Sequence, residues 1–199
     1  MRFKRIFTIF GFLAGFCVLA LTPVEALALV RVKALSTVNV TQFIKKTSKI
    51  TSGQATNMTP EKMQKYLEAH LDKNARFKST MKYNMPNMPT QESALSLNKK
   101  KFIASISEGQ KSIDDYVVEI EILSIDISED GRNAIVQTQS TETGTMPISP
   151  PGMATKDVPI EGSSVCNQVI GLSKKNVIQM VSAQCETTIN FESLEETFQ

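Results

Sequence analysis

The sequence predicts an α+β domain in which helices pack on one strongly curved antiparallel sheet. Apolar residues at helical spacing are concentrated in the first half of the chain, and four long strand-like segments follow in the second half. The first of these long strands switches its side-chain parity midway, which indicates a sharp bend. With 199 residues, 41% of them hydrophobic and 21% charged, the chain is long enough for one ordinary domain plus an extension.

Residues 1–28 are typical of an export signal. The segment begins with basic residues, continues as an apolar stretch to Leu21, and ends with the small-residue motif Ala26-Leu27-Ala28. An uncleaved membrane anchor is the alternative, but the apolar stretch is short for a bilayer span. We therefore expect an exported protein, periplasmic or secreted, with no stable membrane insertion after signal cleavage.

The charge balance argues against a nucleic-acid partner. Removal of the signal takes away three basic residues and one acidic residue, so the 22 basic and 20 acidic residues of the chain fall to 19 of each. A net charge of zero lacks the positive surface that nucleic-acid binding requires.

Residues 29–56 form either an N-terminal extension or a first helix. The abundance of Thr, Ser and Val disfavours a helix here, whereas three apolar residues would give it one buried face: Val38, Phe43 and Ile44. A clearer helix starts after Thr59, which is a good N-cap, with Pro60 at the first helical position. Its apolar face recurs at helical spacing: Met63, Tyr66, Leu67, His70 and Leu71.

A half-buried strand is predicted over residues 75–84, because apolar and polar residues alternate there. Residues 84–97 contain two prolines and are predicted to form a loop. Asn98 can cap a second helix that ends near Gly109 and carries three apolar residues: Phe102, Ile103 and Ile106.

The long strand predicted over Asp115–Ser128 carries the strongest structural signal. Its apolar residues occupy even positions in the first half and odd positions in the second: Tyr116, Val118, Ile120 and Ile122, then Leu123, Ile125 and Ile127. A β-bulge at Ile122-Leu123 would keep both halves on one core face. Asp130-Gly131 then predicts a hairpin turn, and residues 133–143 return as the partner strand.

Residues 144–162 contain four prolines and are predicted to form a long loop. Two strand-like segments follow around a turn signal, and symmetric folding places Cys166 opposite Cys185 across an antiparallel pair. Because these two cysteines remain after signal cleavage of an exported chain, we predict a structural disulfide between them. The second strand continues to Phe191, and residues 192–199 are predicted to be a solvated acidic tail.

The order of helix, strand, helix and four long antiparallel strands resembles the nuclear-transport-factor-two-like (NTF2-like) cone fold. The stretch from Tyr66 to Phe77 (YLEAHLDKNARF) is similar to that family's passage from a helix into the first strand. The resemblance covers about residues 57–191, which we interpret as a cone-like domain. The resemblance implies that the chain shares its fold with ketosteroid isomerases, polyketide cyclases and several exported domains. The enzymes of this family place Asp, His or Tyr inside the cone as acid and base.

Three residues are the catalytic candidates under that resemblance. Tyr66 and His70 meet one turn apart on a helix, where a base–phenol pair can form, and Asp115 follows Asp114 just before the bent strand. A position at the edge of the core, with a local hydrogen bond, explains His70 better than a catalytic role does. Asp114 and Asp115 are adjacent in a strand and therefore point to opposite faces, which argues against a carboxylate pair. No motif transfers a catalytic role to any position.

Methionines are abundant, and thioether sulfur can bind Cu(I) in exported proteins. A role as gap-filling side chains in the core or as exposed loop residues explains the methionines better than Cu(I) binding does: Met81, Met85, Met88, Met146 and Met153. Glu119 and Glu121 alternate on what is interpreted as a solvated sheet face. We therefore expect neither a metal ion nor a cofactor.

Taken together, the sequence predicts an exported, disulfide-bonded cone that acts by binding rather than by catalysis. The partner would be a small apolar ligand in the cone or a protein on the sheet, with a homodimer through the sheet as a further option. The residues expected to line a cavity are Phe77, Met81, Tyr83, Tyr116, Val118 and Ile120. The alternatives are an isomerase- or cyclase-like enzyme and a component of a cell-envelope or secretion assembly.

Overall fold

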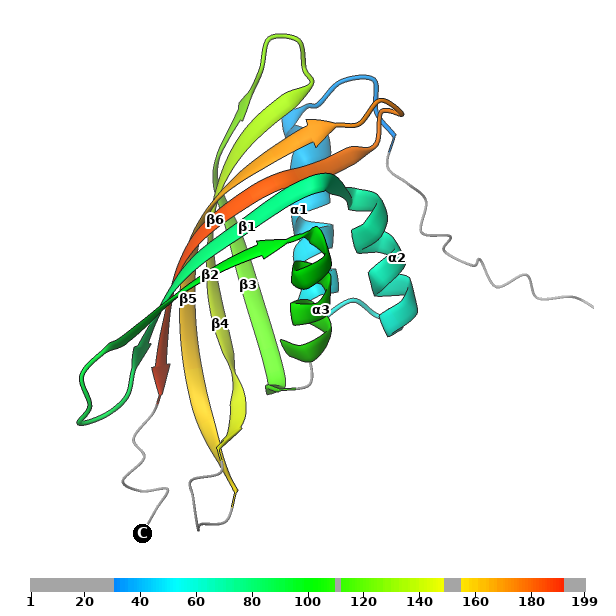
Figure 1. Cartoon of the computed structure of the whole chain (residues 1–199). Helices are drawn as coiled ribbons and strands as arrows, with labels where there is room; N and C mark the ends of the chain where they lie inside the picture. The colour runs from blue at the N-terminus through cyan, green and yellow to red at the C-terminus, as the bar shows by residue number, and fades with distance from the viewer. Residues whose placement is uncertain (1–30, 110–111, 149–154, 192–199) are drawn as a thin grey trace, which may run out of the picture.

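A six-stranded sheet with strand order β2-β1-β6-β5-β4-β3 forms the frame of the molecule (Figure 1). The computed structural model describes residues 31–109, 112–148 and 155–191. The export signal expected over residues 1–28 and the acidic tail expected over 192–199 lie outside the described residues. The described elements are α1 (Thr37–Thr51), α2 (Pro60–His70), β1 (Leu71–Asn84), β2 (Gln91–Asn98), α3 (Lys99–Gly109), β3 (Asp114–Ile127), β4 (Asn133–Ile148), β5 (Lys156–Leu172) and β6 (Ile178–Phe191).

The sheet curls around the helices without closing on itself (Figure 1). Helix α1 packs against β3 at one edge of the sheet, α3 packs against β1 and β2 at the other edge, and α2 contacts α3, β1 and β6. Neighbouring strands are antiparallel except for β1 and β6, which run parallel. The predicted α+β class with helices on a strongly curved sheet is confirmed, and the parallel pair departs from the expected antiparallel order.

Residues 37–51 form helix α1, where the sequence left a helix and an extension open. A capping box begins the helix: the Asn39 N–H donates to the Ser36 hydroxyl at 3.3 Å, and the Ser36 N–H donates to the Asn39 side-chain oxygen at 2.9 Å. Val38 is 67% exposed, so its expected place on the apolar face is wrong. The face that is buried starts at Val40, about 200° around the helix from Val38.

The second and third helices follow their sequence signals. Thr59 caps α2 by accepting from the Lys62 N–H at 3.3 Å, and Asn98 caps α3 by accepting from the Lys101 N–H at 3.0 Å. Helix α2 buries its predicted face, and α3 ends at Gly109 as predicted. None of the described helices has the length and apolar composition needed to span a bilayer.

Strand β1 confirms the predicted alternation and begins directly after α2. The loop predicted for residues 84–97 is wrong in its second half, because residues 91–98 form β2 and pair antiparallel with β1. β2 is an edge strand whose side chains are exposed except at half-buried Leu97, and its apolar alternation is limited to Leu95 and Leu97. Pro86 and Pro89 lie in the turn before β2 and leave its hydrogen bonding intact.

Strand β3 contains the predicted bulge. Its register with β4 slips by one residue between Ile122 and Ser124, which leaves Leu123 as the extra residue. Leu123 is 45% exposed, so its expected place on the inner face is wrong. The inner face carries half-buried residues on both sides of the bulge: Tyr116, Val118, Ile120, Ile122, Ile125 and Ile127. The predicted turn at Asp130-Gly131 is also confirmed, with Gly131 at a φ of 63°.

Strands β4 and β5 run into both ends of the loop predicted for residues 144–162, so that prediction is wrong there. Pro147 and Pro159 lie inside these strands. β3 stops pairing with β4 at Thr145, and β6 stops pairing with β5 at Ile160. Each proline thus lies beyond the end of one neighbouring strand, and its missing N–H can face that unpaired side.

The predicted disulfide hairpin is confirmed. Cys166 of β5 lies directly opposite Cys185 of β6, their Cα atoms are 4.1 Å apart, and a disulfide joins them. Strand β6 then continues to Phe191 as predicted.

The apolar core fills one end of the curled sheet. Leu67 of α2 is fully buried there, together with Val136 near the start of β4 and Ile170 near the end of β5. Farther along the same inner face the side chains become polar: Thr138, Ser140 and Glu142 on β4, and Ser164, Cys166 and Gln168 on β5. This change from apolar to polar side chains marks where the core ends and a pocket begins.

Candidate functional site

A pocket of about 400 Å³ lies between the inner face of the sheet and helices α1 and α3. Ile44 of α1 and Ile106 of α3 contribute to the helical wall, and residues from all six strands form the opposite wall. Phe77 of β1 stacks on Phe102 of α3 with ring centroids 3.8 Å apart, which joins the two walls. The aliphatic and aromatic side chains in these walls suit an apolar ligand.

Four of the six residues expected to line a cavity do line this pocket: Phe77, Tyr116, Val118 and Ile120. Met81 and Tyr83 are half-buried farther along β1 and are not among the lining residues. There the Tyr83 hydroxyl donates to the Met81 sulfur at 3.4 Å. The period-two pattern identified their face of the sheet, but it carries no information on how far along that face the pocket extends.

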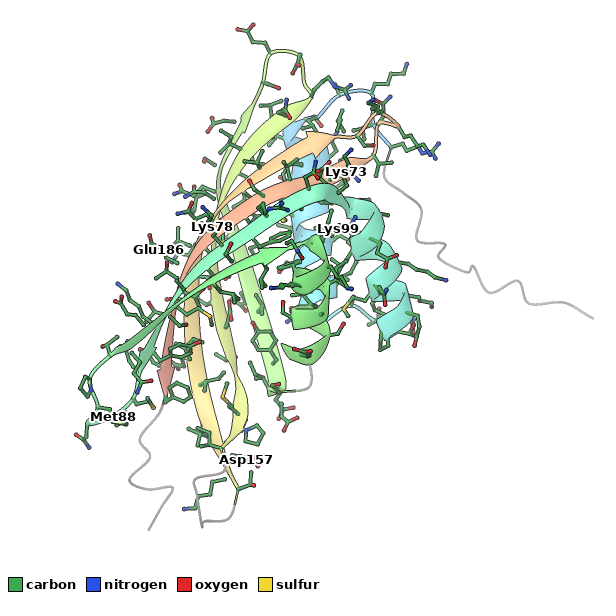
Figure 2. All side chains as sticks on the ribbon, viewed as in Figure 1. Lys73, Lys78, Met88, Lys99, Asp157 and Glu186 are labelled. Atoms are coloured by element: carbon green, nitrogen blue, oxygen red, sulfur yellow. A yellow bond between two sulfur atoms is a disulfide. The ribbon has the colours of Figure 1, made fainter. Side chains whose placement is uncertain are left out.

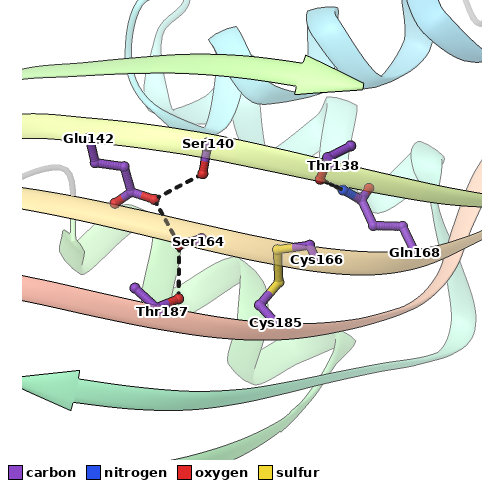
Figure 3. Close-up of a disulfide and its surroundings, with 8 residues drawn as sticks. All are labelled: Thr138, Ser140, Glu142, Ser164, Cys166, Gln168, Cys185 and Thr187. Atoms are coloured by element: carbon purple, nitrogen blue, oxygen red, sulfur yellow. Dashed lines mark hydrogen bonds between the residues drawn. A yellow bond between two sulfur atoms is a disulfide. The ribbon is translucent and has the colours of Figure 1, made fainter. Parts of the chain in front are cut away.

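Glu142 of β4 is the polar centre of the pocket. Its Oε2 accepts from the Tyr116 hydroxyl at 2.7 Å. Its Oε1 accepts from the Ser164 hydroxyl at 3.2 Å and from the Ser140 hydroxyl at 3.4 Å, as Figure 3 shows. The Ser164 and Thr187 hydroxyls are 2.9 Å apart, so hydrogen bonds run across three strands to the carboxylate.

Strand register explains this arrangement. Ser140 pairs with Ser164, and Ser164 pairs with Thr187, so the three hydroxyls form one cross-strand row on the inner face. Glu142 is two residues beyond Ser140 and therefore points to the same face. Alternation within β4 places Ser140 and Glu142 on the inner face, and the pairing of β4 with β5 and of β5 with β6 aligns the three hydroxyls beside the carboxylate.

Tyr116 is held in its protonated form. Burial raises the pKa of its phenol well above the usual range, and the negative charge of Glu142 and the hydrogen bond to that carboxylate raise the pKa further. The Tyr116 hydroxyl therefore acts as a hydrogen-bond donor to Glu142.

The inner polar row continues toward the core through the disulfide and one amide (Figure 3). Cys166 and Cys185 line the pocket, and the Gln168 side-chain N–H donates to the Thr138 hydroxyl at 3.0 Å. Gln168 is 7% exposed, and its Oε1 has no hydrogen-bond partner among the described residues. Buried oxygen acceptors in proteins rarely lack a hydrogen-bond partner. Gln168 lines the pocket, so its Oε1 is a hydrogen-bond acceptor beside the pocket.

Tyr66 and His70 come together as their helical spacing suggests, with ring centroids 4.4 Å apart, but neither is among the pocket-lining residues. The Tyr66 hydroxyl lies 2.9 Å from the Thr47 hydroxyl, and His70 Nδ1 lies 2.8 Å from the carbonyl oxygen of Ile178. Burial raises the pKa of Tyr66 and lowers the pKa of His70. Both side chains are therefore neutral near pH 7 and connect α2 to α1 and β6.

Asp114 and Asp115 begin the edge strand β3, where both are exposed and neither lines the pocket. Asp115 has a φ of 50°, so it marks a local turn into the strand. Because Tyr66 and His70 are buried on α2, the three candidates named from the sequence do not form one site. The remaining acidic residues expected on a solvated sheet face are exposed: Glu119 and Glu121.

The methionines are spread over several elements. Met81 is on β1 and Met146 is on β4, whereas Met85 and Met88 lie in the turn between β1 and β2, where Figure 2 labels Met88. Met153 lies outside the described residues. Across residues 31–109, 112–148 and 155–191, no three His, Cys, Asp or Glu side chains are grouped to hold a metal ion.

Glu142 was missed in the sequence analysis, although the sequence carries a signal for it. Ala134 and Val136 are buried on the inner face, and a period of two carries that face through to Glu142. The apolar residue Ile135 obscured this reading, because it makes both faces of the strand look partly apolar.

No family model matches the chain, and no curated protein matches it. Among solved structures, a type 2 hexachlorocyclohexane dehydrochlorinase (LinA) is similar with a TM-score of 0.47 at 6% identity, covering 74% of this chain and 84% of that one. ActVI-ORFA from Streptomyces coelicolor has a TM-score of 0.46 at 9% identity, covering 78% and 93%. An NTF2-like protein from Cytophaga hutchinsonii has a TM-score of 0.40 at 16% identity, covering 76% and 98%.

The topology has helices on the inner side of a curled, unclosed sheet that ends in a four-strand meander. The chain has an NTF2-like cone fold. The inner face of the cone forms one wall of a largely apolar pocket, and one carboxylate, a protonated phenol and a row of hydroxyls converge on that wall. Such a site can hold an apolar body and orient it through one polar end.

Proposed function

We propose that the protein binds a small, mainly apolar molecule in the pocket of its cone. The observation that supports this proposal is the 400 Å³ pocket between the inner sheet face and helices α1 and α3. This volume lies in the range of small-molecule sites, and its apolar wall with a few converging polar groups is typical of them. The ligand would lie between Val118 and Ile120 of β3 and the apolar face of α3.

The state of the polar groups favours binding over catalysis. A general base needs a free lone pair on an atom that can take up a proton. The pKa of Tyr116 is raised, so its phenol keeps its proton, donates to Glu142 and does not act as a base. The enzyme alternative has one specific observation in its favour, the 2.7 Å contact of Tyr116 with Glu142, which resembles an acid–base pair in geometry.

A matched pair of tryptophan substitutions tests the proposal. Val118 lines the pocket, whereas its neighbour Val117 is 46% exposed on the outer face of the same strand. The probe is N-phenyl-1-naphthylamine, an uncharged apolar fluorophore. Wild-type protein and Val117→Trp should bind the probe equally, and Val118→Trp should bind on the order of tenfold more weakly because the indole occupies the pocket.

Two outcomes would contradict the proposal. One is equal binding by Val117→Trp and Val118→Trp, and the other is the absence of probe binding by folded wild-type protein. The chain contains no native tryptophan, so the fluorescence of each variant reports its own site and shows whether it is folded. Turnover of an added substrate that Tyr116→Phe abolishes without loss of folding would instead favour the enzyme.

Export is part of the same proposal. The signal expected over residues 1–28 and the disulfide between Cys166 and Cys185 support it, because disulfides persist in oxidising compartments. Intact mass spectrometry of protein recovered from outside the cytoplasm should give a chain beginning at Leu29 with the cysteines oxidised. Recovery of the full chain from the cytoplasm with free thiols would contradict export.

A further inference from the structure

We propose that Glu142 makes the pocket selective for a ligand that carries a protonated amine on its apolar body. This inference rests on the proposed function and names the class of ligand that the pocket takes. It follows from three features of the described residues: the free acceptor capacity of the carboxylate, its lack of an ion-pair partner, and the hydroxyl row that orients it.

The Glu142 carboxylate retains acceptor capacity after its protein contacts are made. Two carboxylate oxygens offer about four acceptor sites. The short 2.7 Å bond from Tyr116 uses one site on Oε2, and the longer contacts from Ser164 at 3.2 Å and Ser140 at 3.4 Å use those on Oε1. One site on Oε2 is left, and it suits an N–H donor of a ligand.

The negative charge of Glu142 has no cationic partner among the described residues. The ion pair found in that part of the chain joins Lys82 to Glu92 on β1 and β2. Lys78 is the other charged residue among those lining the pocket, but it lies on β1, with β6 and β5 between it and β4. Figure 2 places Lys78 on the side of the sheet away from α3, on the same side as Glu186.

A half-buried carboxylate without a cation favours a ligand that brings one. Glu142 is partly removed from water, and apolar side chains such as Val118 and Ile106 line the same pocket. Charge pairs are stronger in such surroundings than in bulk water, and a hydrogen bond from a charged donor is about twice as strong as one from a neutral donor. An ammonium group would therefore gain more from Glu142 than a hydroxyl of the same ligand would.

The hydroxyl row fixes the carboxylate before a ligand arrives. Ser164 has one hydroxyl proton, so when it donates to Glu142, Thr187 must donate to Ser164. The row then runs in one direction, from β6 through β5 to β4. Because Tyr116 holds the second oxygen from β3, the carboxylate is held from both sides and need not reorganise on binding.

Competition between two matched ligands tests this inference. Octylamine and 1-octanol share one chain and differ in the charged group, and each is measured by displacement of N-phenyl-1-naphthylamine at pH 7.5. We expect octylamine to bind roughly tenfold more tightly than 1-octanol to wild-type protein. Glu142→Gln should remove the preference for octylamine over 1-octanol, and Glu121→Gln, which removes the same charge from the exposed outer face, should retain it.

The outcomes separate this inference from the function on which it rests. Equal affinity of the two ligands for wild-type protein would overturn the selectivity and leave the apolar pocket standing. If folded wild-type protein does not bind the probe at all, the proposed function itself is overturned. The ratio of the octylamine and 1-octanol affinities of wild-type protein tests the selectivity even where Glu142→Gln does not fold. If folded Glu142→Gln prefers octylamine as strongly as wild-type protein does, the selectivity comes from another group.

Discussion

His70 makes the stability of the fold depend on pH in a range where few other groups titrate. It is the single histidine of the chain, its side chain is 2% exposed, and its Nδ1–H donates to the Ile178 carbonyl at 2.8 Å. The Tyr66 ring lies against it at 4.4 Å and the Phe43 ring at 5.7 Å. These surroundings disfavour the charged imidazolium, and burial therefore lowers the pKa of His70.

The sign of the effect follows from the direction of that pKa shift. Below pH 6.5 the unfolded chain binds a proton at His70 that the folded protein refuses, so acid favours unfolding. The stabilisation is present above the unfolded pKa and is lost as the pH falls. The loss of stability between pH 7.5 and 5.5 is at most about 1.4 kcal/mol, which is the free energy of one pKa unit.

Urea unfolding of wild-type protein and His70→Gln at pH 7.5, 6.5 and 5.5 measures this loss. The glutamine amide can donate to the Ile178 carbonyl but does not titrate, so its free energy of unfolding should change less with pH. The difference between the two proteins at each pH removes the contribution of carboxylates, which titrate mainly below this range. Parallel pH dependences of the two proteins would refute the assignment of the slope to His70.

Two further predictions concern the sheet. Reduction of the disulfide, or the double change Cys166→Ser and Cys185→Ser, should lower the free energy of unfolding by about 2–3 kcal/mol, and equal denaturation midpoints with and without reductant would contradict this. Insertion of one alanine between Ser124 and Ile125 should destabilise the protein by several kcal/mol, because an additional residue without a second bulge moves one half of β3 to the opposite face. Leu123→Ala, which keeps the bulge and trims a 45% exposed side chain, should cost less than about 1 kcal/mol when both variants are measured by urea unfolding.

The features that the sequence predicted are those in which a local pattern determines the geometry. The parity switch in β3 required an extra residue to keep one face inward, and the structure has it at Leu123. Thr59 and Asn98 fixed the starts of two helices, because capping groups act within one helical turn. The cysteine pair followed from symmetric folding about one turn.

The features that the sequence did not predict depend on partners far along the chain. Nearly every side chain of strand β2 is exposed, so its pairing with β1 leaves only a short apolar alternation at Leu95 and Leu97. Pro147 and Pro159 indicate a loop locally, and they fit into strands only because β3 and β6 end before reaching them. The site itself is of this kind, because Glu142 becomes its centre only when β3 brings Tyr116 and β5 brings Ser164.

The disulfide joins two strands in the wall of the pocket. Along β5 and β6 the inner residues change from the apolar pair Ile170 and Met180 to Cys166 and Cys185, and then to polar Ser164 and Thr187. The pocket is not filled with side chains, so the strand residues that line it pack less closely than those at the core end. The covalent bond lies in the wall of the pocket, between Gln168 and Ser164 of β5, and holds β5 to β6 there.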